Sequence, residues 1–204
     1  MTFWRKLTEK SWEHVGEIDG PDGDVSATAQ PKRVALRMFL CVVASLFFLL
    51  LVAYRIRMGY PDWRPLPLPA ILWFNTAMLV LASVVMQWTR AKAEMEADGP
   101  LRIGMVASGL LTVAFIAGQL LAWTQLESAG YGLRGNPASA FFYLLTAVHG
   151  LHVLGGLWVW FRATARAFGE DGAGAVRMSV QLCASYWHFL LLVWLVMLYF
   201  LLKT

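Results

Sequence analysis

Two histidines three residues apart, His149 and His152, lie in an otherwise apolar stretch, FFYLLTAVHGLHVLGG, that covers residues 141–156. Imidazole nitrogens bind haem iron and copper, relay protons and form hydrogen bonds, so three kinds of chemistry are open to this pair. Positions i and i+3 share one face of a helix. A third histidine, His188, lies in another apolar stretch near the end of the sequence. The choice among these chemistries depends on the elements that carry the three residues.

Five apolar blocks make up most of the chain, and each is long enough to cross a bilayer, which takes about 20 helical residues. They cover residues 38–56, 67–89, 103–124, 139–161 and 178–202. No Asp, Glu, Lys or Arg occurs within them apart from Arg55. Hydrophobic residues form 58% and charged residues 15% of the 204 residues, whereas an average soluble domain has about half and about a quarter. The sequence therefore predicts an all-α membrane bundle of five transmembrane helices.

The distribution of basic residues predicts the orientation of this bundle. With the N-terminus in the cytoplasm and the C-terminus outside, only five of the 17 Lys and Arg residues lie outside, namely Arg55, Arg57, Arg64, Arg134 and Lys203. Cytoplasmic loops are enriched in Lys and Arg, so this orientation is favoured. The net charge of +4 then reports topology and gives no reason to expect nucleic-acid binding. Residues 1–34 contain DGPDGD and are expected to form a polar, flexible cytoplasmic tail before a transmembrane domain of residues 35–204.

The three membrane histidines are candidate functional residues, because ionisable groups are costly within a bilayer. His149 and His188 each lie ten residues into their blocks, about 15 Å deep at 1.5 Å per residue, and so near the midplane. Two histidines at i and i+3 cannot ligate opposite faces of one haem, although His188 with either of them could, and all three could hold copper. No carboxylate or thiolate accompanies them, and no membrane carboxylate supports a proton relay. We therefore favour neutral imidazoles hydrogen-bonded to facing helices and holding their register.

Other residues predict helix contacts. Asn75, Thr76 and Gln119 are uncharged hydrogen-bonding residues suited to pairing between helices. Trp187 and Trp194, seven apart on one helix face, are expected to pack on lipid or a partner. Asn136 before Pro137 is expected to cap a helix. Small residues four apart, which allow close helix approach, occur at Gly104 and Ser108, at Ala114, Gly118 and Ala122, and at Thr146 and Gly150.

Two motifs resemble a known family. FFYLLTAVHGLHVLGG is similar to the stretch FFxLTxxHGxHV, followed by glycine, of subunit III of the haem–copper terminal oxidases. YWHFLLLVWLVMLYF, residues 186–200, is similar to that family's YWHFxDxVW segment. WFNTAMLVLASVVMQWTRAKA, LLLVAYRIR and FIAGQLLAW resemble its other helices more weakly. The resemblance covers residue 34 to the end, and five spans match the short bacterial form.

This resemblance implies a multi-pass subunit of the bacterial plasma membrane with no catalytic residues and no haem, copper or other metal of its own. Haem and copper are expected in its partners, the catalytic subunit I and subunit II, and structural phospholipid is expected in a cleft of the bundle. The subunit would steady the oxygen-reducing centre and assist proton uptake. Residues expected at interhelix or subunit contacts are Asn75, Gln119, Tyr143, Thr146, His149, Gly150, His152, Tyr186, Trp187, His188 and Trp194.

Three positions depart from the family pattern. Carboxylates that the family carries correspond here to Val43, Ala122 and Leu191. Proton handling by those groups is therefore not expected of this chain, whereas the packing role is. Two alternatives remain: an accessory subunit of a nitric oxide reductase, or an independent membrane protein that binds haem or metal through its histidines.

Overall fold

The computed structural model describes residues 23–133, 135–169 and 172–203. The chain divides into two compact units, residues 1–37 and residues 38–204. The predicted tail lies outside the described residues up to position 22. Residues 23–34, which belong to the same predicted tail, are helical and continue α2 beyond the apolar block, with Pro31 inside the helix.

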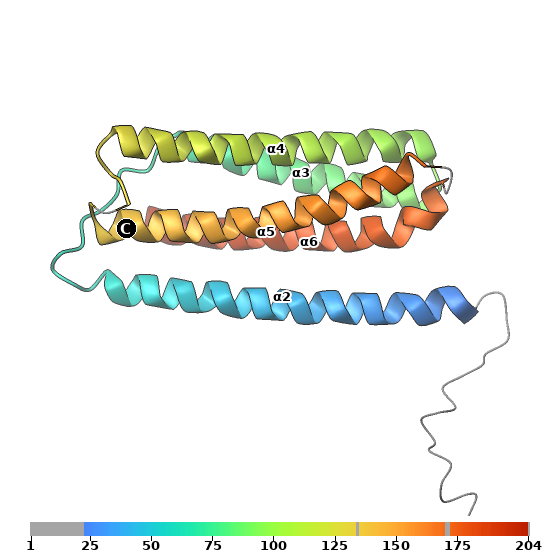
Figure 1. Ribbon diagram of the computed structural model, residues 1–204, viewed down its shortest axis with the longest axis horizontal. Coiled ribbons are helices and arrows are strands. Elements are labelled where there is room, and N and C mark those ends of the chain that lie inside the picture. The colour runs from blue at the N-terminus through green and yellow to red at the C-terminus, as the bar shows by residue number, and fades with distance from the viewer. Residues whose placement is uncertain (1–22, 134, 170–171, 204) are drawn as a thin grey trace, which may run out of the picture. The chain divides into compact units, whose positions relative to one another are not determined.

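Five helices of the described chain are long and apolar enough to cross a membrane, which confirms the predicted all-α, five-span fold (Figure 1). They are α2 (Gly23–Arg57), α3 (Ile71–Glu94), α4 (Asp98–Ser128), α5 (Pro137–Ala167) and α6 (Gly172–Leu202).

The helices extend beyond the apolar blocks at one end of the bundle. The connections left between the apolar blocks, at 90–102 and 162–177, are shorter in the structure, because α3 ends at Glu94 and α4 begins at Asp98, while α5 ends at Ala167 and α6 begins at Gly172. The charged sequence TRAKAE, which ends α3, contains good helix formers, so polarity alone did not mark the end of the helix. Glu96 turns the chain between α3 and α4 with a left-handed φ of 54°. At the other end the links 58–70 and 129–136 are longer.

The cap predicted for α5 is confirmed. Asn136 is the N-cap, its side-chain oxygen accepts a hydrogen bond from the backbone N–H of Ala138 at 3.2 Å, and Pro137 opens the helix. The Asn136 amide also donates to the carbonyl oxygen of Arg64 at 2.6 Å. One residue thus starts a helix and ties together the two long connections.

Helices α3 to α6 form a ring in which each packs against its two neighbours in the order α3, α4, α5, α6. Figure 1 shows these four helices running alongside one another. Glycines mark the closest approaches: a Cβ on Gly118 would lie 2.0 Å from the Asn75 side-chain oxygen, and one on Gly104 would lie 2.1 Å from the Thr89 hydroxyl. Gly109 and Gly156 make similar contacts with Trp160 and Tyr186, which the spacing pattern did not predict.

Residues 38–57 of α2 pack differently. Among the described residues, no Cα atom of α2 lies within 8 Å of a Cα atom in another helix. Large side chains fill the wider spacing. Phe47 contacts His149 and His152 of α5, and Tyr54 contacts Phe141 of α5 with ring centroids 5.7 Å apart. The helix is therefore joined to the bundle through rings, whereas α3 and α4 approach closely at glycines.

Candidate functional site

The His149 ring is fully buried where side chains of three other helices meet. Its centroid lies 5.3 Å from that of Trp194 in α6, 5.8 Å from that of Phe115 in α4 and 6.2 Å from that of Phe47 in α2. The exposed fraction of His149 is 0%. The histidine singled out in the sequence is therefore the centre of an aromatic cluster.

Neither ring nitrogen of His149 has a hydrogen-bond partner in the described part of the chain. The prediction that its imidazole is hydrogen-bonded to a facing helix is therefore wrong. The neighbours from α2, α4 and α6 offer ring carbons at this position, so His149 contributes packing. The sequence placed the histidine correctly, but it could not identify the residues opposite it.

His152 lies one turn further along α5. Its Nδ1 is 2.7 Å from the carbonyl oxygen of Val148, and its ring centroid is 5.5 Å from that of Phe47. The hydroxyl of Tyr186, in α6, donates to the backbone carbonyl of His152 at 2.9 Å. His152 is thus hydrogen-bonded within its own helix, and the link to the next helix runs through Tyr186.

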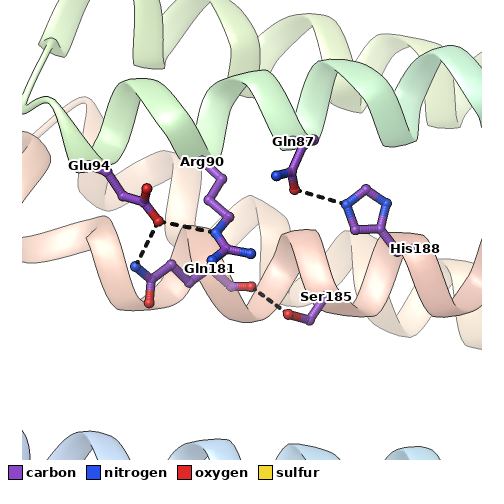
Figure 2. Close-up of polar contacts among 6 residues, drawn as sticks. All are labelled: Gln87, Arg90, Glu94, Gln181, Ser185 and His188. Atoms are coloured by element: carbon purple, nitrogen blue, oxygen red, sulfur yellow. Dashed lines mark hydrogen bonds and ion pairs between the residues drawn. The ribbon is translucent and has the colours of Figure 1, made fainter.

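His188 makes the hydrogen bonds between helices that were predicted for these histidines. Its Nδ1 is 2.5 Å from the hydroxyl of Ser83, and its Nε2 is 3.0 Å from the amide oxygen of Gln87, both in α3. Figure 2 shows Gln87 facing His188 across the α3–α6 contact. His188 thus holds α6 against α3 from an exposed position, away from the aromatic cluster around His149.

No group of three or more His, Cys, Asp or Glu side chains in the described residues could hold a metal ion. His149 is surrounded by rings from α2, α4 and α6, whereas the partners of His188 come from α3. The arrangement of the three histidines is that of packing and hydrogen-bonding residues in two separate places.

Tryptophan–threonine hydrogen bonds form a second set of polar links between helices of the bundle. The indole N–H of Trp187 donates to the hydroxyl of Thr112, and that of Trp194 donates to Thr76, each at 3.0 Å. Both indoles are 1% exposed, so they pack against other helices of the bundle and not on lipid. The paired indole and hydroxyl satisfy each other, which explains why these large side chains are buried.

A third bond of this kind joins α4 to α5, from Trp123 to Thr146 at 3.0 Å. The hydroxyl of Tyr143 lies 3.3 Å from the carbonyl oxygens of Trp123 and Tyr131. Gly150, predicted with Thr146 as a close-approach pair, has open space where a Cβ would stand. Thr146 and Tyr143 thus contact α4, whereas Gly150 does not mediate a close approach.

Asn75 and Gln119 pair as their residue types predicted. The Asn75 amide donates to the Gln119 side-chain oxygen at 3.2 Å, and both residues are buried. The Asn75 oxygen and the Gln119 amide nitrogen have no further partner in the described chain. Gly118 provides the space for this pair, because any side chain there would collide with Asn75.

The three positions at which the resemblance implies carboxylates have apolar side chains that are at least partly buried. Val43 and Ala122 are 3% and 0% exposed, and Leu191 is half-buried. The sequence reasoning missed the partners of the histidines: Ser83 and Gln87 for His188, and Phe47 and Phe115 for His149. The signal for the first pair was available, because Ser83 and Gln87 are polar residues four apart within an apolar block.

These contacts define a multi-pass α-helical membrane protein whose buried polar side chains mainly join its own helices. A family model described as cytochrome c oxidase subunit III matches residues 34–203. The chain belongs to this family and is an accessory subunit III of a haem–copper oxidase.

Three relatives indicate the range of similarity. Cytochrome c oxidase subunit 3 of Synechocystis sp. is 30% identical over 78% of this chain and 70% of its own length. That of Thermostichus vulcanus is 27% identical over 80% and 83%. Cytochrome bo(3) ubiquinol oxidase subunit 3 of Pseudomonas aeruginosa is 29% identical over 76% and 75%.

Proposed function

We propose that this subunit packs against the catalytic subunit I of its oxidase, beside subunit II, in a bacterial plasma membrane. Haem and copper belong to those partners. The N-terminus lies in the cytoplasm, as the positions of the Lys and Arg residues favour. The role of the chain is to stabilise the oxygen-reducing subunit, and electrons do not pass through it.

The main support for this proposal is the match to the subunit III family over residues 34–203. The packing of the three histidines in the motifs that resemble the family supports it further. His149 and His152 contact rings, and His188 binds Ser83 and Gln87. Each of these histidines thus helps to hold helices together. A chain built in this way suits a rigid neighbour for a catalytic subunit.

The apolar residues at Val43, Ala122 and Leu191 support a packing role without the proton handling that carboxylates there would provide. Aliphatic side chains neither bind nor release protons. Phospholipid beside α2 is part of the same proposal, because residues 38–57 approach the bundle through large side chains and leave much of the helix exposed.

The test is purification of the tagged chain from its native membrane in mild detergent, followed by a reduced-minus-oxidised optical spectrum. We expect a larger haem-bearing subunit to co-purify and the eluate to consume oxygen. Nitric oxide consumption without oxygen consumption would assign the chain to a reductase. A coloured chain without partners would contradict the proposal, because the haem would then belong to this chain.

A further inference from the structure

A strip of polar side chains runs along the outer face of α3 and α6. It is formed by Gln87, Arg90 and Glu94 of α3 and by Gln181, Ser185 and His188 of α6, shown in Figure 2. Gln87, Ser185 and His188 are exposed in the chain on its own. Arg90 Nε donates to Glu94 at 3.2 Å, and the Gln181 amide donates to the same carboxylate at 3.4 Å. We refer to these six residues as the polar strip.

The polar strip extends into the part of the bundle that hydrocarbon surrounds. Gln87 lies seven residues before Glu94, the last residue of α3, which is about 10 Å along the axis at 1.5 Å per residue. His188, which binds Gln87, is at the same depth and lies near the middle of α6. Beyond this pair the same face becomes apolar, with exposed Val84 and Leu192.

The outer faces of the other helices have a different character. The exposed side chains in the middle of α4 are Val106, Leu110, Val113, Ala117 and Leu120, and those of α5 include Leu144, Leu151, Leu154 and Val159. In α2 the exposed hydroxyl of Ser45 donates to its own helix, at Cys41. Lipid chains can cover the aliphatic side chains named here without leaving a polar group unpaired.

Gln87 has hydrogen-bonding capacity that the described chain does not satisfy. One end of its amide binds His188 Nε2, and no other bond involves its side chain in the described residues. The oxygen and nitrogen of a side-chain amide can exchange places, but either orientation leaves one of them facing outward without a partner. Lipid tails supply neither donor nor acceptor, so an unpaired amide at this depth is unfavourable.

We infer that the polar strip is the surface that docks on a transmembrane helix of the catalytic subunit. That helix should present a side chain or carbonyl able to hydrogen-bond Gln87 at the depth of His188, and polar groups opposite Arg90 and Glu94 nearer the membrane surface. Polar side chains between membrane helices are an established source of association. This inference rests on the proposed function, which requires a membrane partner, and identifies the face that meets it.

A bulky substitution tests the assignment. We expect Ser185→Trp, in the middle of the polar strip, to lower the haem that co-purifies with the tagged chain by about tenfold, equivalent to about 1.4 kcal/mol. The matched control is Ala117→Trp, a similar enlargement of an exposed small residue on the outer face of α4, which should leave co-purified haem within about twofold of the original chain. The amount of each variant in the membrane is measured alongside.

If Ser185→Trp does not accumulate in the membrane, cross-linking can identify the neighbour of position 185 instead. Ser185→Cys and Ala117→Cys, each in a chain with Cys41→Ala and Cys183→Ala, carry a photoreactive maleimide in native membranes. An adduct of Ser185→Cys with the haem-bearing subunit, absent for Ala117→Cys, supports the inference. An adduct with a second copy of this chain, with lipid alone, or with the haem-bearing subunit only from position 117 overturns it.

The two experiments separate this inference from the proposed function. If the unaltered chain brings down no haem-bearing subunit, the proposed function fails. If the unaltered chain and Ser185→Trp bring down that subunit equally well, the proposed function stands and the polar strip is not the docking face.

Discussion

His149 illustrates how a polar residue can serve as an apolar one. Its imidazole is buried among Phe47, Phe115 and Trp194, and its nitrogens have no partner in the described chain. Leaving a buried donor or acceptor unpaired costs about 1–3 kcal/mol. The ring contacts with α2, α4 and α6 must offset that cost.

This balance predicts opposite effects of two substitutions at the position. His149→Phe keeps a ring and removes the unpaired nitrogens, so we expect the free energy of unfolding to stay level or rise by about 1 kcal/mol. His149→Ala leaves a cavity and should lower it by about 2–4 kcal/mol. Tryptophan fluorescence of the purified subunit during denaturation in mixed micelles measures both. A large decrease in the free energy of unfolding for His149→Phe would mean that the imidazole nitrogens are hydrogen-bonded in the native protein.

Two glycines provide a matched pair at the same scale. Gly118→Ala would place a Cβ 2.0 Å from the Asn75 oxygen, which should displace Asn75, weaken its bond to Gln119 and cost about 1–3 kcal/mol. Gly150→Ala would place its Cβ in open space, so the higher helix propensity of alanine should raise the free energy of unfolding by about 0.5–1 kcal/mol. The same unfolding measurement compares them. Equal effects at both positions would contradict the close approach of α3 and α4.

At the scale of the elements, tryptophan–threonine bonds couple neighbouring helices. Thr112→Val preserves the shape of the side chain and removes the acceptor of the Trp187 indole, and Thr76→Val does the same for Trp194. We expect each substitution to lower the free energy of unfolding by about 0.6 kcal/mol, the average for a hydrogen bond between membrane helices. Thr124→Val is the control, because that hydroxyl bonds its own helix from an exposed position and should change stability little. If Thr124→Val lowered the free energy of unfolding as much as Thr112→Val, the result would contradict a contribution of the tryptophan–threonine bonds to interhelical coupling.

The elements differ in how far the sequence could predict them. Five spans followed from uninterrupted apolar blocks, and the start of α5 followed from Asn136 and Pro137. The end of α3 did not, because Lys, Glu and Ala suit both a helix and a polar loop. The partners of His149 also remained hidden. Phe47 lies in a helix that no local pattern links to α5, so their meeting is a property of the assembled bundle.

At the scale of the whole molecule, the short and long connections should lie on opposite sides of the membrane. Met95 in the α3–α4 link is 71% exposed, and Leu133 in the α4–α5 link is 61% exposed. With Cys41 and Cys183 replaced by alanine, we expect Leu133→Cys to react with a membrane-impermeant maleimide in intact cells. Met95→Cys should react only after the cells are permeabilised. The reverse pattern would place the N-terminus outside.

The way α2 packs has a consequence for biosynthesis. The ribosome completes α2 before helices α3 to α6, yet His149, a ring partner of Phe47, follows roughly a hundred residues later. The α3–α4 hairpin can close as soon as both helices leave the translocon, because its glycine contacts are local. Helix α2 has to wait alone in the bilayer until α5 arrives. Its aromatic side chains are then exposed to lipid or to an insertion chaperone, and a chain arrested before α5 would hold α2 without its partners.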